Sequence, residues 1–221
     1  MAKRKLWKFA QLETFKNAIQ ATSQNFNQDF SLKGKWSKEY FKNDRPIILE
    51  LGCGKGEYSV GLAEKYPDIN FIGIDVKGER LWRGCTNAQE KNLTNVVFIR
   101  TQIQYIENFF QKDEVSEIWV TFPDPQPQPG KSQKRLTSPY FLEKYRNILK
   151  EDSIIHLKTD NAPLFDFTLE TINEEKHQLI YSTHDLYSKE LIDDILNIKT
   201  FYENKFLQQG IPICYLKFKL S

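Results

Sequence analysis

The segment PIILELGCGKGEYSVGLAEKY, residues 46–66, decides the fold. Its first six residues, PIILEL (46–51), form a short apolar run that Gly52 ends, and such a run predicts a buried strand. Glycines at positions 52, 54 and 56 follow as a loop, and EYSVGLAEKY (57–66) then predicts a helix that stops before Pro67. The order strand, glycine loop and helix indicates the first unit of an α/β sheet.

The same alternation of strand and helix continues to the end of the chain. Apolar runs predict further strands at 70–76, 95–100, 116–122 and 153–159. Helices are predicted after residue 76 to about Glu90, at 138–150 with Ser138 as N-cap, and at 161–175. Two more strands are predicted at 177–184 and 212–220, around a helical segment. We therefore expect an α/β fold with a doubly wound, mostly parallel seven-stranded sheet over residues 46–221.

Residues 1–45 are expected to form a basic helical extension of this domain. A stripe of apolar residues recurs there at helical spacing and favours packing against the body of the protein: Leu6, Phe9, Leu12, Phe15 and Ile19. Direct contact with a partner is the second interpretation of this segment.

The composition is that of a globular protein, because 40% of the 221 residues are apolar and 27% are charged, with a formal net charge of +2. The charge is unevenly distributed. Residues 1–12, 125–142 and the part after Glu203 carry basic but no acidic residues, as expected when one face meets a polyanion. Solvated lysines that keep the protein soluble are the alternative interpretation.

The sequence gives no indication of a metal site, a disulfide framework or a membrane span. The cysteines, Cys53, Cys85 and Cys214, are odd in number and far apart, and the histidines show no metal-binding spacing. The basic N-terminus leads into no signal-peptide core, and no run approaches the ~18 apolar residues of a membrane span. We expect a cytoplasmic protein without a metal, and we infer no obligate protein partner.

Polar side chains stand where the predicted strands end. They are Glu50, Asp75, Gln102, Asp124 and Asp160. In doubly wound sheets the ligand crevice lies outside the carboxyl ends of the strands, so these residues are candidates for one shared site.

The glycine loop reads G-x-G-x-G, and Glu57 occupies the place of the third glycine of dinucleotide fingerprints. A glutamate there disfavours a phosphate, so a nucleoside ligand without phosphate, such as S-adenosylmethionine, fits better. Gly52 and Gly54 would leave room for its methionine portion, and Glu50 would face its ammonium group. Asp75 can accept hydrogen bonds from both ribose hydroxyls. In the alternative interpretation the glycines only make a tight turn and Asp75 caps a helix.

The segment TFPDPQPQPGKSQKRL (121–136) follows the fourth predicted strand. Pro123 and Pro125 would fix the backbone on either side of Asp124 and hold its carboxylate at the mouth of the crevice. Three basic residues follow, which we expect to meet an RNA backbone: Lys131, Lys134 and Arg135.

The chain resembles the bacterial tRNA (guanine-N7-)-methyltransferases in the order of five segments between about residues 46 and 215. These are LELGCGKG, FIGID, TFPDP with the following KSQKRL, LKTD and TFYENKFLQQG. The resemblance implies a Rossmann-like methyltransferase fold. It also implies transfer of a methyl group from S-adenosylmethionine to nitrogen 7 of a guanine in the variable loop of tRNA.

The resemblance further implies roles for individual residues. It gives Glu50, Asp75 and Asp124 as cofactor contacts. We add Gly52 and Gly54 from the glycine loop, and Gln102, which stands where the family has an aspartate that touches the adenine. Asp124 is also the catalytic acid, and the substrate contacts are Asp160, Thr200, Phe201, Tyr202 and Glu203. The chain departs from the family in two places: Gln102 replaces an aspartate, and Gln126, Pro127 and Gln128 replace Trp, His and Lys.

The chemistry of guanine explains why such residues suit the reaction. Nitrogen 7 has a lone pair and no proton, so alignment with the methyl group, and not a general base, lowers the barrier. Asp160 and Glu203 supply acceptors for the N–H donors of the Watson–Crick edge, and Asp124 can stabilise the positive charge of the product. In the alternative interpretation, Asp160 caps the following helix and Glu203 lies on a solvated helix face.

Two other functions remain as alternatives at this level. A methyltransferase that uses S-adenosylmethionine on another RNA or a small molecule would keep the 50–75 region but leave the basic segments unexplained. A non-catalytic RNA-binding protein on the same fold would have little reason to keep acids at five positions of the site.

Overall fold

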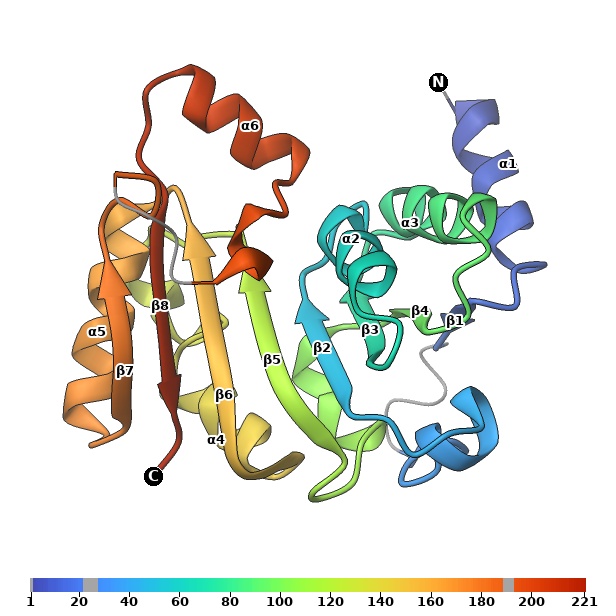
Figure 1. The fold of residues 1–221 in the computed structure, drawn as a ribbon, viewed down its shortest axis with the longest axis horizontal. Coiled ribbons are helices and arrows are strands. Elements are labelled where there is room, and N and C mark those ends of the chain that lie inside the picture. Colours follow the sequence, from blue (N-terminus) through green and yellow to red (C-terminus); the bar gives the residue numbers. More distant parts are fainter. Residues whose placement is uncertain (1, 22–27, 189–192) are drawn as a thin grey trace.

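One twisted sheet of eight strands runs through the part of the chain that the computed structural model describes (Figure 1). That part comprises residues 2–21, 28–188 and 193–221, with side chains from Leu6 onward. The strands are β1 (Ala18–Gln20), β2 (Ile47–Leu51), β3 (Asn70–Asp75), β4 (Val96–Arg100), β5 (Val115–Thr121), β6 (Leu149–Thr159), β7 (Gln178–Thr183) and β8 (Cys214–Lys219). Their order is β1-β4-β3-β2-β5-β6-β8-β7. Strand β8 is antiparallel to both of its neighbours, β6 and β7, and the other described pairs are parallel. The predicted α/β fold with a mostly parallel sheet is confirmed.

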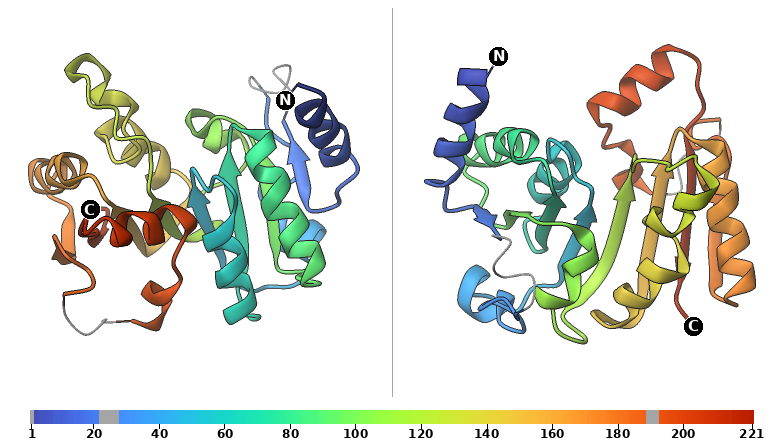
Figure 2. Two further views of the ribbon diagram at one scale, coloured as in Figure 1. Left: turned by 90° about the horizontal axis from the view of Figure 1, so that it is seen from above. Right: turned by 180° about the vertical axis from the view of Figure 1, so that it is seen from behind.

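Helices cover both faces of this sheet. On the front face in Figure 1, α2 (Glu57–Lys65) and α3 (Gly78–Glu90) pack on the sheet, and α1 (Ala2–Leu12) packs on α3. The view from behind in Figure 2 shows α4 (Pro139–Arg146) and α5 (Ala162–Glu174) on the other face. The last helix is α6 (Phe201–Gln208), and the short turns are η2 (Trp36–Phe41), η3 (Ile103–Asn108), η4 (Pro129–Lys134) and η5 (Asp194–Asn197). None of the described helices is long and apolar enough to cross a membrane.

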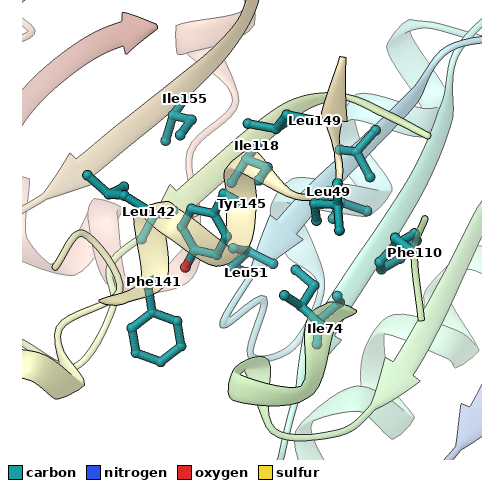
Figure 3. Packing of buried hydrophobic residues seen from close by; sticks show 14 of the residues in the cluster. Leu49, Leu51, Ile74, Phe110, Ile118, Phe141, Leu142, Tyr145, Leu149 and Ile155 are labelled. Carbon is teal, nitrogen blue, oxygen red and sulfur yellow. The ribbon is translucent and has the colours of Figure 1, made fainter. Parts of the chain in front are cut away.

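Alternation of side chains along the strands builds a core on each face. On the back face, Leu49 and Leu51 of β2 pack with Tyr145 of α4, as Figure 3 shows. On the front face, Ile48 of β2 and Phe98 of β4 pack against α2 and α3. Every residue of β2 and β3 is buried, as expected for central strands of a parallel sheet.

The N-terminal extension differs from the prediction. The helix α1 ends at Leu12, and residues 18–20 form β1, which pairs in parallel with β4. This strand supplies hydrogen-bond partners to an edge of β4 that would otherwise stay unpaired. The prediction of a helical stripe as far as Ile19 is therefore wrong, and the described sheet has eight strands instead of seven.

The helix predicted at 138–150 is also shorter than expected. It begins as predicted, with Ser138 at the N-cap, but ends at Arg146. Strand β6 already begins at Leu149, whose neighbour across the sheet is Val115 of β5. The last two residues of the predicted helix therefore belong to β6, because Leu149 pairs with β5.

Candidate active site

Two adjoining cavities lie at the carboxyl ends of the parallel strands. The inner cavity, about 60 Å³, is lined by residues of β2, the glycine loop, β5 and α6, including Glu50, Gly54, Thr121, Thr200 and Tyr202. The outer cavity, about 470 Å³, extends from β3 to α4, and its lining includes Asp75, Gln102, Lys134, Leu136 and Tyr140. Gly52 lines both cavities, so a single ligand that passes Gly52 would reach both.

The glycine loop between β2 and α2 has left-handed backbone at all three glycines, with φ of 75° at Gly52, 55° at Gly54 and 66° at Gly56. A Cβ atom at Gly52 or Gly54 would meet no atom closer than 3.8 Å, so it would clash with nothing there, and both glycines line the inner cavity. A Cβ atom at Gly56 would lie 2.4 Å from the ring of Phe98. The loop therefore combines a cradle open to the cavities with close packing of α2 on the sheet.

Glu50 carries a buried carboxyl group at the end of β2, with 4% of the residue exposed. One oxygen accepts hydrogen bonds from the Ser59 N–H at 2.9 Å and from the Ser59 hydroxyl, and the other accepts from Thr121 Oγ1 at 2.6 Å. Burial raises the pKa of Glu50 to about 7, although these hydrogen bonds act in the opposite direction. A cationic group in the inner cavity would therefore favour the ionised form of Glu50.

Asp75 joins the end of β3 to the glycine loop. Its Oδ2 accepts a hydrogen bond from the Gly54 N–H at 2.9 Å, and its Oδ1 accepts from the Lys77 N–H at 2.7 Å. The N-cap residue of α3 is Lys77, so the alternative interpretation of Asp75 as the helix cap is wrong. Both oxygens keep acceptor capacity toward the outer cavity, whose wall also contains Gln102 at the start of η3.

Asp124 lies in an exposed turn after β5, between two residues with left-handed backbone, Phe122 (φ 47°) and Gln126 (φ 45°). Its Oδ1 accepts a hydrogen bond from the Gln126 N–H at 3.1 Å. Asp124 lines neither cavity, but Phe122 lines the inner one and Gln126 the outer one. Asp124 therefore lies between a residue that lines the inner cavity and one that lines the outer cavity.

The basic segment after this turn has two environments. Lys131 and Lys134 of η4 are exposed, and neither forms an ion pair with an acid among the residues that the structure describes. Arg135 is partly buried instead. Its guanidinium carbon lies 4.3 Å from the centre of the Phe167 ring, and its Nε and Nη2 each donate to the Gln126 carbonyl at 3.4 Å. The three basic residues are neighbours in the sequence, but Arg135 packs against Phe167, whereas the two lysines are exposed.

Asp160 follows β6 and is half-buried, and burial raises the pKa of its carboxyl group. The N-cap of α5 is the next residue, Asn161, whose side chain accepts a hydrogen bond from the Leu164 N–H at 2.9 Å. The alternative interpretation of Asp160 as the helix cap is therefore wrong. Its carboxyl group therefore lies just after β6 and caps no helix.

The turn that begins α6 lies next to the glycine loop. Thr200 caps the helix and lines the inner cavity together with Tyr202. Phe201 is 54% exposed, its N–H donates to Glu57 Oε2 at 2.7 Å, and Lys55 Nζ lies 4.5 Å from the centre of its ring. Three of the predicted substrate residues are thus brought to the edge of the predicted cofactor loop.

Glu203, the fourth residue of this turn, is fully buried. Its Oε1 lies 2.7 Å from Nζ of Lys158, which is fully buried too, and accepts a hydrogen bond from the Tyr187 hydroxyl at 2.6 Å. The alternative interpretation of Glu203 on a solvated helix face is therefore wrong. Sequence reasoning also missed Lys158, although a lysine inside the apolar run SIIHLKT (153–159) indicates a buried partner.

Known relatives of this chain are methyltransferases. Residues 44–216 match a family described as "Putative methyltransferase". The curated tRNA (guanine-N(7)-)-methyltransferase of Christiangramia forsetii is 52% identical, over 100% of this chain and 99% of the relative. The protein of the same name from Bacteroides thetaiotaomicron is 50% identical, over 100% of this chain and 87% of the relative.

Solved structures share the fold at much lower identity. The 16S rRNA methyltransferase KamB aligns with a TM-score of 0.65 at 13% identity, over 88% of this chain and 95% of that chain. A 30S ribosomal A1408 methyltransferase from an uncultured bacterium aligns with a TM-score of 0.58 at 19% identity, over 82% and 90% of the two chains. At these identities the likeness concerns the fold alone.

Proposed function

The chain belongs to the tRNA (guanine-N7-)-methyltransferase family: it is an enzyme that methylates nitrogen 7 of a guanine in tRNA, and we propose that this guanine lies in the variable loop. We place the reaction where the inner and outer cavities meet, in a methyltransferase domain of residues 46–221. The observation that supports this placement is the lining of the inner cavity, which has the glycine loop on one side and Thr200 and Tyr202 on the other. A cytoplasmic location follows as a proposal, because tRNA is a cytoplasmic substrate.

The lining of the two cavities fits S-adenosylmethionine. When bound, this donor supplies an electrophilic methyl group on a positively charged sulfur. Glu50 would face the ammonium end beside the open glycines Gly52 and Gly54, and Asp75 and Gln102 would hold the ribose and the adenine. The donor set supports this assignment, since it offers a carboxyl group that ionises near neutral pH, a strand-end carboxylate and a backbone cradle. We propose no metal, and among the described residues no cluster of three or more His, Cys, Asp or Glu could hold one.

The guanine would enter between the turn that begins α6 and the end of β6. Asp160 would accept hydrogen bonds from the N–H groups of the Watson–Crick edge, and Thr200 and Tyr202 would line the pocket. The nucleophilic nitrogen carries no proton, so holding the base in line with the methyl group is the main task of these residues. Asp124, in the turn after β5, would stabilise the positive charge that develops on the ring.

The RNA backbone would run over the exposed lysines of η4. Lys131 and Lys134 carry charges that no acid within the described residues neutralises, and they follow directly on the Asp124 turn. Each phosphate that they neutralise releases counterions, so binding of tRNA should weaken as salt increases. Extrusion of the base costs a few kcal/mol, which such contacts can offset.

The proposed function is tested by incubation of the protein with unmodified tRNA and S-adenosylmethionine labelled on the methyl group, followed by nucleoside analysis. The expected product is 7-methylguanosine from the variable loop, and a tRNA with adenine in place of the target guanine is the matched control. Ribosomal RNA serves as a competing substrate, because the fold is shared with ribosomal RNA methyltransferases. Label in another nucleoside, or only in ribosomal RNA, would refute the proposal.

A further inference from the structure

A fully buried lysine, Lys158 of β6, contacts the turn that begins α6. Its Nζ lies 2.7 Å from Glu203 Oε1, and neither side chain has exposed surface. The same ammonium group donates hydrogen bonds to the Leu196 carbonyl at 3.1 Å and to the Ile198 carbonyl at 3.4 Å. Its three donors are thereby all used within the protein. Burial lowers the pKa of Lys158, and Glu203 opposes this effect.

Glu203 is equally committed to partners inside the protein. Its Oε1 also accepts from the Tyr187 hydroxyl at 2.6 Å, and its Oε2 accepts from the Thr200 N–H at 3.3 Å. In return the Glu203 N–H donates to Thr200 Oγ1 at 3.2 Å, which completes a capping box. Both carboxylate oxygens therefore serve internal bonds, and the side chain presents no surface to a ligand.

This buried pair stands between the sheet and the wall of the inner cavity. Figure 1 shows α6 above the carboxyl ends of the strands. Thr200 and Tyr202, in the turn that begins α6, line the inner cavity, and the Phe201 N–H bonds to Glu57 beside the glycine loop. The capping box ties this turn to Glu203, and Lys158 ties Glu203 to β6. The position of the cavity wall therefore depends on the buried pair.

We propose that Lys158 is a positioning residue for methyl transfer. Through Glu203 it fixes the turn Thr200–Glu203 over the inner cavity, and Glu203 itself makes no contact with the guanine. This inference rests on the proposed function and changes the role that the family resemblance implies for Glu203. Asp160 is then the carboxylate that accepts from the edge of the base.

Removal of one member of such a pair differs from removal of both. A buried charge without its partner is strongly destabilising, whereas replacement of both members by apolar side chains of similar size is often neutral. Lys158→Met and Glu203→Met each leave one uncompensated charge, and the double variant leaves none. If Glu203 contacted the guanine, Glu203→Met and the double variant would lose methylation activity to the same extent. If Glu203 acts together with Lys158 to hold the turn, the double variant is more active than either single variant.

The experiment measures kcat and the KM for tRNA of the wild type, both single variants and the double variant, with 7-methylguanosine as the product. We expect kcat/KM to fall about a hundredfold in each single variant and to recover to within about tenfold of the wild type in the double variant, because the two changes are coupled. The Kd for S-adenosylmethionine of the double variant should match the wild type, and its melting temperature should lie above those of both single variants. A double variant that meets both expectations and is no more active than Glu203→Met would overturn the proposal.

Tyr187→Phe keeps the test decisive where a methionine variant fails to fold. It removes only the hydroxyl that donates to Glu203, so we expect the KM for tRNA to rise about threefold at an unchanged Kd for the methyl donor. Unchanged kinetics for tRNA in Tyr187→Phe would count against the proposal. A wild-type protein that forms no 7-methylguanosine counts against the proposed function instead, and this result is known before any variant is compared.

Discussion

The guanidinium group of Arg135 stacks on the ring of Phe167, with 4.3 Å between its central carbon and the centre of the ring. The same group donates two hydrogen bonds to the Gln126 carbonyl, each at 3.4 Å, and the Gln126 N–H donates to Asp124. Arg135 is thus connected to the proposed catalytic acid through a single residue. A planar guanidinium group suits this combination of stacking and in-plane donation, which a lysine cannot reproduce.

Arg135→Ala is expected to lower kcat about tenfold, because the turn that carries Asp124 loses its support and small misplacements are costly in methyl transfer. Lys131→Ala is the matched control, because Lys131 is exposed in η4 and lines neither cavity: it should remove one phosphate contact and reduce the slope of log Kd against log salt by about 1. Steady-state kinetics and tRNA binding at several salt concentrations separate the two effects. An equal loss of salt slope in Arg135→Ala would show that Arg135 binds the RNA itself.

Asp124→Ala is expected to lower kcat about a hundredfold or more, because a charge placed near the developing cation is lost. Binding of tRNA, measured by filter retention, should persist. Asp124→Asn distinguishes charge from shape, since an asparagine oxygen can still accept the hydrogen bond from the Gln126 N–H. Activity of Asp124→Asn close to that of the wild type would assign Asp124 a role in the geometry of the turn alone.

The strand-end residues could be predicted from the sequence because their positions follow from local patterns. Apolar runs locate the strands, and parallel strands bring their carboxyl ends to one edge, so Glu50 and Asp75 had to lie near the glycine loop. Three features were not predictable in this way. The strand β1, the stacking of Arg135 and the pair between Lys158 and Glu203 each depend on a partner distant in sequence. A pattern within one segment can indicate that a buried lysine needs a partner, but it does not identify which distant residue that partner is.

Glu50 predicts a pH dependence of stability. Its folded pKa of about 7 lies above the usual 4.5, so between these values the native state binds a proton that the unfolded state has released. The contribution of Glu50 to the free energy of unfolding is therefore fully present below about pH 4.5. It is lost as the pH rises toward 7, by an amount on the order of 3 kcal/mol. Urea unfolding of the wild type and Glu50→Gln across this range measures the difference. Identical pH profiles of the two proteins would contradict the prediction.

Glu50 also predicts how the methyl donor binds. Affinity for S-adenosylmethionine should increase as the pH rises through about 7, because the ionised carboxylate attracts the ammonium group of the donor. In Glu50→Gln this increase should vanish, and the affinity at pH 8 should be about tenfold lower. Calorimetric titration at a series of pH values gives both quantities. A rise in affinity that persists in Glu50→Gln would mean that another group titrates.

Asp160 and Asn161 offer a pair of adjacent substitutions that should separate activity from stability. Asp160→Asn replaces a carboxylate that caps no helix and whose pKa is raised by burial, so the free energy of unfolding should not decrease. Activity should fall between about tenfold and a hundredfold in kcat/KM, since hydrogen bonds from the base to a charged acceptor are lost.

Asn161→Ala should behave in the opposite way. It removes the acceptor for the Leu164 N–H, which is the cap of α5, and should cost about 1 kcal/mol of unfolding free energy. Its kcat/KM should stay close to the wild type, because the side chain faces the helix and not the base. Thermal unfolding and methylation kinetics on both variants give the four values needed. A loss of stability in Asp160→Asn equal to that in Asn161→Ala would show that Asp160 supports the helix, and the assignment of Asp160 to the guanine would then lose its basis.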